Sequence, residues 1–104
     1  LMAKSGKLVK ISELDMGYND AAGQPIMTEN LTEEQHKQMR DYYKFIVGQY
    51  FKIVPLAQQY GITQWCITDA PKGSSWRGGE PTGLWNANFL RKHTYAGFAD
   101  GLRM

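Results

Sequence analysis

The sequence predicts an α/β fold made of two consecutive βα units, which is about a quarter of a (β/α)8 barrel. Two short runs rich in β-branched residues, 7–14 and 62–68, are each followed by a long loop and then by an amphipathic helix. Long loops after parallel strands are typical of the catalytic end of such barrels, but two strands cannot close one. We therefore expect residues 1–104 to be one portion of a larger barrel, without an internal domain boundary.

Composition restricts the class of protein before any motif is considered. Of the 104 residues, 42% are hydrophobic and 21% are charged, and the formal net charge is +2. These values are typical of a globular domain, and no apolar run approaches the roughly 18 residues of a membrane span. The 12 basic residues are spread along the chain, which argues against a nucleic-acid partner.

The first elements expected are the end of a helix and then a strand. Residues 1–5 have no helix start of their own, and Gly6 is suited to cap the end of a helix, so we expect further chain before Leu1. The run 7–14, with its β-branched residues, is predicted as a strand. The stretch 17–30 is rich in Gly, Asn, Asp and Pro, which is typical of a loop.

A long helix is predicted over 33–53. Thr32 and Gln35 have the spacing of a capping box, and the apolar residues that follow recur at helical spacing. Pro55 lacks an N–H and disfavours helical geometry in the residue before it, so the helix is expected to end at residue 52 or 53.

A second strand is predicted over 62–68, after a short turn at 56–60. This run is β-branched and aromatic and reads as largely buried. Within it, Cys66 is interpreted as a buried thiol and not as a nucleophile, because neither His is suggestively placed. A loop over 69–89 and a final helix over 92–102 complete the chain.

Glu13 is the first candidate functional residue, because a carboxylate at the end of an apolar strand is costly to bury. In a barrel it would lie where strands deliver side chains to the C-terminal mouth, close to Ser12 and Asp15. The alternative is a charge that pairs with a Lys or caps the next helix. Asp69, at the end of the second predicted strand, is a further acidic candidate, with an Asx turn or a loop cap as its alternative.

A second candidate cluster is the Gly-rich segment 75–79, with Trp65 on the strand before it. An exposed Trp76 would offer a flat face to sugar C–H groups, and Arg77 would add hydrogen-bond donors. The alternative for Trp76 and Trp85 is a side chain folded over a hydrophobic patch, and for Trp65 it is a core position in mid-strand.

No cofactor or metal is expected. His36 and His93 are interpreted as surface or capping residues of helices. The sequence shows no Cys/His spacing of a metal site, no phosphate-binding Gly loop after a strand and no Gly-x-Ser-x-Gly turn.

At residues 10–15, 63–69 and 75–77 the sequence resembles glycoside hydrolase family 10, which comprises mainly β-1,4-xylanases. That family has an Ile-Thr-Glu-Leu-Asp-like motif on barrel strand seven, a Trp-Gly-x-Thr-Asp motif on strand eight and a Ser-Trp-Arg loop after it. Residues 88–98 resemble its closing segment, so the resemblance spans essentially the whole chain. It implies the C-terminal part of a (β/α)8 catalytic barrel, about its last two βα units.

The resemblance also implies an activity, that of a retaining endo-β-1,4-xylanase with xylan or xylo-oligosaccharide as substrate. It implies no cofactor, and a secreted, periplasmic or cell-surface location. The site residues it implies are Glu13 as the nucleophile, Trp65, Trp76 and Arg77 at the substrate, and Asp15 and Asp69 as hydrogen-bonding supports of strand ends and loops.

Two departures from the family pattern are visible. Cys66 stands where the family commonly has Gly, and the stretch 70–74 lengthens the loop before Trp76. The family's acid/base glutamate lies on strand four, well before Leu1, so residues 1–104 alone are expected to be inactive and to need the preceding barrel portion as partner. The alternative is a non-catalytic carbohydrate-binding or barrel-complementing fragment, whose apolar strand faces would favour oligomers or domain swapping.

Overall fold

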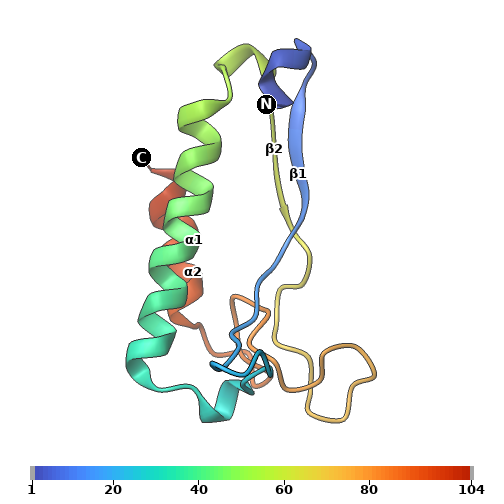
Figure 1. Cartoon of the computed structure of the whole chain (residues 1–104), viewed down its shortest axis with the longest axis vertical. Coiled ribbons are helices and arrows are strands. Elements are labelled where there is room, and N and C mark those ends of the chain that lie inside the picture. Colours follow the sequence, from blue (N-terminus) through green and yellow to red (C-terminus); the bar gives the residue numbers. More distant parts are fainter. Residues whose placement is uncertain (1, 104) are drawn as a thin grey trace.

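The computed structural model describes residues 2–103 and places two helices against a two-stranded parallel sheet (Figure 1). The predicted α/β fold is confirmed. β1 pairs with β2, α1 connects the two strands, and α2 packs against α1. In chain order the elements are η1 (Met2–Ser5), β1 (Val9–Leu14), η2 (Thr28–Asn30), α1 (Glu33–Ile53), η3 (Leu56–Gln58), β2 (Gln59–Gln64) and α2 (His93–Leu102), where η marks a short 3-10 helix.

The bounds of α1 agree with the local signals in the sequence. The Thr32 hydroxyl accepts a hydrogen bond from the Gln35 backbone N–H at 3.1 Å, and the Gln35 side-chain oxygen accepts one from the Thr32 N–H at 2.9 Å. This reciprocal pair is the predicted capping box. The helix ends at Ile53, two residues before Pro55, because proline disfavours helical geometry in the residue that precedes it.

The predicted bounds of the second strand are wrong. β2 covers Gln59–Gln64, so Gly61 lies inside it, and the strand ends before Trp65. β1 ends at Leu14, and the carbonyl of this last residue accepts a hydrogen bond from the Trp65 N–H at 2.9 Å. Pairing between β1 and β2 goes no further. The rest of the apolar run pairs with another partner, because the Leu84 N–H donates to the Ile67 carbonyl at 2.8 Å.

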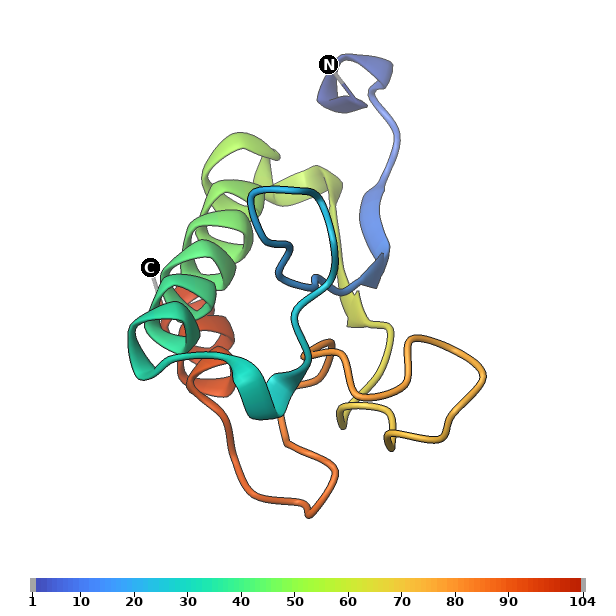
Figure 2. The same cartoon turned by 60° about the horizontal axis from the view of Figure 1, so that its bottom comes forward.

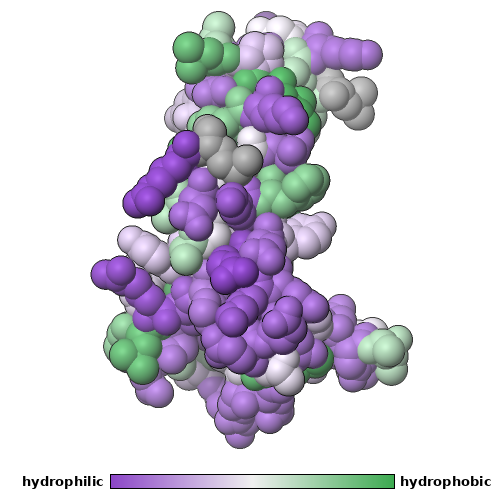
Figure 3. Space-filling model, turned by 90° about the vertical axis from the view of Figure 1, so that its left-hand side faces the viewer, coloured by the Kyte–Doolittle hydropathy of each residue, from purple (hydrophilic) through white to green (hydrophobic). Residues whose placement is uncertain are grey.

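The core lies between the sheet and α1. One cluster contains Leu14, Tyr43, Val47 and Leu84, and a second contains Val9, Tyr50 and Val54. The outer side of the two helices is mostly hydrophilic (Figure 3). Neither helix covers the opposite face of the sheet (Figure 1), so the packed layer described here is one-sided.

The loops that follow β1 and β2 gather at one end of the molecule, beyond the C-terminal ends of the strands (Figure 2). This is the end at which a (β/α)8 barrel carries its active site. No helix within residues 2–103 has both the length and the apolar character that crossing a membrane requires.

Candidate active site

Glu13 reaches the uncovered face of the sheet because β1 contains a bulge. Val9 and Ile11 pack toward α1, and strict alternation would place Glu13 on that same side. The register changes from Ile11 opposite Ile62 to Leu14 opposite Gln64, which gives β1 one residue more than β2. Leu14 therefore takes the buried position, with 8% exposure, and Glu13 is exposed. Bulges of this kind redirect side chains beside active sites.

Trp65 projects from the same uncovered face. Gln64, the residue before it, points to the helix side, where its amide donates to the Tyr43 hydroxyl at 3.1 Å. Neighbouring residues of a strand alternate, and Trp65 is accordingly 52% exposed. The core alternative for Trp65 does not hold in this chain, because its side chain is exposed.

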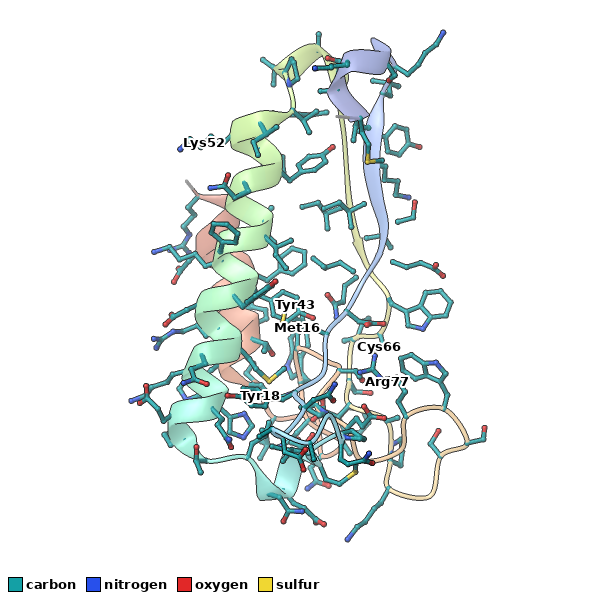
Figure 4. The ribbon with its side chains drawn as sticks, in the orientation of Figure 1. Met16, Tyr18, Tyr43, Lys52, Cys66 and Arg77 are labelled. Atoms are coloured by element: carbon teal, nitrogen blue, oxygen red, sulfur yellow. The ribbon has the colours of Figure 1, made fainter. Side chains whose placement is uncertain are left out.

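Arg77 joins the two loops that follow the strands. Its Nη1 lies 3.1 Å from Asp15 Oδ1, and its Nε lies 3.2 Å from Glu80 Oε1. The guanidinium carbon also lies 5.5 Å from the ring centre of Trp76, which is 41% exposed. Figure 4 shows Arg77 reaching from its loop toward the chain that follows β1.

Trp85 has a different environment. Its ring packs edge-on against Tyr95, with the ring centres 5.0 Å apart, and it lies against the core cluster of Leu14 and Tyr43. The Trp85 side chain therefore covers apolar surface, which is the alternative to a sugar contact for this residue.

Asp69 is a buried anchor and not an Asx turn. Its carboxylate accepts hydrogen bonds from the Thr28 hydroxyl, the Gly83 N–H and the Lys92 ammonium, each at 2.8 Å. These partners come from the loop after β1, the loop after β2 and the start of α2. Asp69 thus links these segments through partners distant in sequence.

Lys92 was not singled out by the sequence reasoning. It is almost fully buried beside Asp69, and this burial lowers the pKa of its ammonium group, while the hydrogen bond to Asp69 acts in the opposite direction. A lysine at the N-cap of α2 is electrostatically unfavourable, because the helix dipole is positive at that end. A lysine at the start of a predicted helix is therefore the feature of the sequence that indicates a carboxylate partner.

Cys66 is only partly buried, which corrects the interpretation of a buried thiol. Its Sγ donates to the Thr82 carbonyl at 3.4 Å. Desolvation raises the pKa of the Cys66 thiol, and the hydrogen bond to Thr82 offsets part of this effect. Because the thiolate is the reactive form, the environment does not favour a nucleophile here.

The two histidines lie together where α1 and α2 begin. His93 pairs with Glu33, and its ring centre lies 6.4 Å from that of His36. Burial, followed by the nearby charge of Lys92, lowers the pKa of His36. Among residues 2–103 no group of three or more His, Cys, Asp or Glu side chains is arranged to hold a metal ion.

The structure thus brings most of the predicted site residues to one end of the sheet. Asp15 and Trp76 each contact the Arg77 side chain, while Glu13 lies near the end of β1 and Trp65 directly follows β2. Asp69 anchors the loops behind them. The sequence reasoning missed Gly17, Glu80 and Lys92, whose roles depend on contacts between loops.

Comparison with known sequences gives one family. The sequence profile of glycosyl hydrolase family 10 matches residues 1–101. No curated protein sequence matches the chain significantly.

Several solved xylanase structures superpose on the chain. Xylanase 10C from Cellvibrio japonicus gives a TM-score of 0.76 at 27% identity, over 95% of this chain and 23% of that chain. A mutant of the same xylanase, in complex with xylopentaose, gives 0.76 and 27% over 95% and 22% of the two chains. A thermostable mutant of another xylanase from Cellvibrio japonicus gives 0.74 and 26% over 93% and 31%. The chain thus spans less than a third of the length of these xylanases.

Proposed function

Because the chain belongs to glycosyl hydrolase family 10, we propose that it forms the C-terminal part of a retaining endo-β-1,4-xylanase, with Glu13 as the nucleophile. The observation that carries this proposal is the bulge in β1, which turns Glu13 onto the uncovered face of the sheet beside Trp65. The xylanase bound to xylopentaose supports a xylo-oligosaccharide or xylan as the ligand.

In the proposed reaction two carboxyl groups about 5–5.5 Å apart act on opposite faces of the sugar. The Glu13 carboxylate attacks the anomeric carbon, and the bond from that carbon to the leaving oxygen breaks. The second carboxyl group protonates the leaving oxygen, then takes a proton from the water that cleaves the glycosyl ester of Glu13. In this proposal the second carboxyl group belongs to the preceding barrel portion. The resemblance implies that it lies on strand four of the barrel.

The proposed location is secreted, periplasmic or at the cell surface. Xylan is a polymer too large to diffuse across a membrane, so a hydrolase for it must meet it outside the cytoplasm. Immunodetection of the protein only in the cytoplasmic fraction of the source cells would contradict this part of the proposal.

The activity is tested with the chain alone and with the chain fused behind the preceding βα units of a Cellvibrio japonicus xylanase. Circular dichroism first establishes that each protein is folded. The chain alone is expected to release no reducing sugar from xylan. Turnover by the chain alone would contradict the proposal that the acid/base carboxyl group lies outside residues 1–104. The fused protein is expected to hydrolyse xylan.

The role of Glu13 is tested in the fused protein with Glu13→Ala and, as a control on the exposed side of α1, Glu34→Ala. Glu13→Ala is expected to abolish xylan hydrolysis, whereas Glu34→Ala leaves it unchanged. With an aryl xylobioside and azide, Glu13→Ala should regain turnover and yield the inverted glycosyl azide, because azide takes the place of the carboxylate. Xylan hydrolysis that persists in Glu13→Ala would exclude the nucleophile role.

The second candidate function is a non-catalytic carbohydrate-binding or barrel-complementing fragment. The uncovered sheet face and the exposed Tyr60, Trp65 and Ile67 favour it. Gel filtration of the chain, with and without a separately expressed N-terminal barrel portion, tests complementation and self-association. Xylopentaose binding by the isolated chain without turnover in the fused protein would favour the binding module.

A further inference from the structure

The guanidinium of Arg77 is held from two sides by carboxylates of different loops. Asp15 comes from the loop after β1, at 3.1 Å, and Glu80 from the loop after β2, at 3.2 Å. The side chains of Asp15, Arg77 and Glu80 are 22%, 31% and 14% exposed. Solvent therefore screens these two pairs less than it screens ion pairs on the open surface.

The backbone around Arg77 is shaped to direct this side chain. Arg77 has φ 46°, a left-handed conformation that is uncommon for residues other than glycine and persists where surrounding contacts enforce it. The loop closes tightly at the next residue, because a Cβ at Gly78 would lie 2.7 Å from the carbonyl oxygens of Lys72 and Ser74. The lengthened loop is thus a compact unit that sets the starting point of the Arg77 side chain.

Gly17 provides the space into which the guanidinium fits. A Cβ at residue 17 would lie 2.4 Å from Arg77 Nη2, and 3.5 Å from Glu80 Oε1. Both of these atoms are the ends of flexible side chains, and no backbone atom is among the nearest neighbours. A methyl group at this position therefore displaces the guanidinium without a clash against the main chain.

We propose that Arg77 is a positioning residue for Trp76, and that Asp15, Glu80 and Gly17 hold it in place. The guanidinium carbon lies 5.5 Å from the ring centre of Trp76, within the range of a cation–π contact. This contact covers one face of the indole, which is 41% exposed overall. The clamp of Asp15, Gly17, Arg77 and Glu80 thereby fixes the direction in which the indole is presented.

For the proposed xylanase, and resting on that function, the clamp sets the affinity for the sugar chain and not the chemical step. An indole held in one orientation stacks on a pyranose ring without first losing conformational freedom. Release of the clamp is therefore expected to raise KM for a xylo-oligosaccharide, while kcat, which depends on Glu13, changes little.

The clamp is tested in the chain itself by labelling with 5-fluorotryptophan. The three fluorine resonances are assigned by single Trp→Phe variants. Gly17→Ala and Glu80→Gln are both expected to shift the Trp76 resonance and to leave those of Trp65 and Trp85 in place. The matched control is Gly73→Ala, which adds the same methyl group to the loop that carries Trp76, at a position where nothing lies within 4 Å.

A double variant separates the clamp from a general effect on folding. In an Arg77→Ala background, Gly17→Ala has no guanidinium to displace, so it is expected to shift the Trp76 resonance no further. A Trp76 signal that does not move in Gly17→Ala or in Glu80→Gln would overturn the inference. So would an undiminished effect of Gly17→Ala in the Arg77→Ala background.

The consequence for the sugar is measured separately in the fused protein. Gly17→Ala is expected to raise KM for xylopentaose roughly tenfold, comparable to the loss of one oriented aromatic contact, with kcat within about twofold of the parent. If the parent fused protein is inactive, the proposed function fails while the fluorine spectra still decide the clamp. A fall in kcat at unchanged KM would refute the positioning role.

Discussion

The hydroxyl of Tyr50 accepts a hydrogen bond from the backbone N–H of Gly61 at 3.0 Å. It accepts a second from the N–H of Tyr60 at 3.0 Å and donates to the carbonyl of Val9. At this point the register moves from Val9 opposite Gln59 to Lys10 opposite Gly61, so β2 has one residue more than β1. A side chain of α1 therefore satisfies backbone groups that the bulge in the sheet leaves unpaired.

Replacing Tyr50 by Phe should destabilise the chain by about 1–3 kcal/mol, because polar backbone groups are left without a partner. Urea denaturation followed by circular dichroism measures the free energy of unfolding. The control is Tyr42→Phe, on a side chain that is 59% exposed, where a change within about 0.5 kcal/mol is expected. Equal effects of the two substitutions would show that Tyr50 does not complete the sheet.

Asp69→Asn should destabilise the chain by about 3–5 kcal/mol, because it leaves the buried ammonium group of Lys92 without its counter-charge. The double variant Asp69→Asn/Lys92→Met is expected to recover part of this loss. As a control, Asp41→Asn removes the partner of Arg40 at the surface. This substitution is expected to change the free energy of unfolding by too little to measure. If the double variant is no more stable than Asp69→Asn, the buried charge is not the source of the loss.

Alkaline pH should weaken the fold through Tyr43. Burial, the dominant cause, raises the pKa of its phenol to about 12, from an ordinary value of 10.0. The folded chain holds this proton more tightly than the unfolded chain. The contribution of Tyr43 to the free energy of unfolding is therefore full below pH 10 and is lost as pH rises from 10 to about 12. The loss amounts to about 3 kcal/mol.

Denaturation curves of the parent and of Tyr43→Phe across that pH interval test this prediction. Tyr43→Phe is expected to have a smaller free energy of unfolding at neutral pH, since it loses the hydrogen bond to Gln64, but a flatter decline with pH. Parallel declines of the two proteins would contradict it.

Gly97→Ala should separate α1 from α2. A Cβ at residue 97 would lie 2.0 Å from the carbonyl oxygen of Arg40, which belongs to the main chain of α1 and cannot rotate away. Alanine is favoured over glycine in a helix by about 1 kcal/mol. We nevertheless expect the free energy of unfolding, measured by thermal denaturation, to fall by about 1–3 kcal/mol, because the clash outweighs this gain. Gly73→Ala, which meets nothing within 4 Å, is the control, and an increase in stability of Gly97→Ala would refute this packing.

Much of the helical part of the fold could be predicted because its signals are local. The capping box of Thr32 and Gln35 and the stop before Pro55 involve residues within a few positions of each other, and both helix bounds agree with the structure. The bounds of β2 could not be predicted in this way. Its apolar run continues beyond Gln64, and the strand ends there because β1 has ended.

The candidate site divides along the same line. Glu13, Trp65, Trp76 and Arg77 were identified from residue type and motif, and the structure leaves all four at the loop-bearing end of the sheet. The contacts that organise them were not predictable, since the pairs Asp15–Arg77 and Asp69–Lys92 join segments separated by 62 and 23 positions.

By itself the sequence determined that the chain contains two βα units, that its long helix begins and ends at particular residues, and that Glu13 lies near the end of a strand. Only the tertiary structure decided which way Glu13 faces. Alternation from Val9 and Ile11 points it toward α1, and the additional residue between Ile11 and Leu14 points it to the uncovered face. The physical reason is that helix caps depend on neighbouring residues, whereas strand register depends on hydrogen bonds to a distant strand.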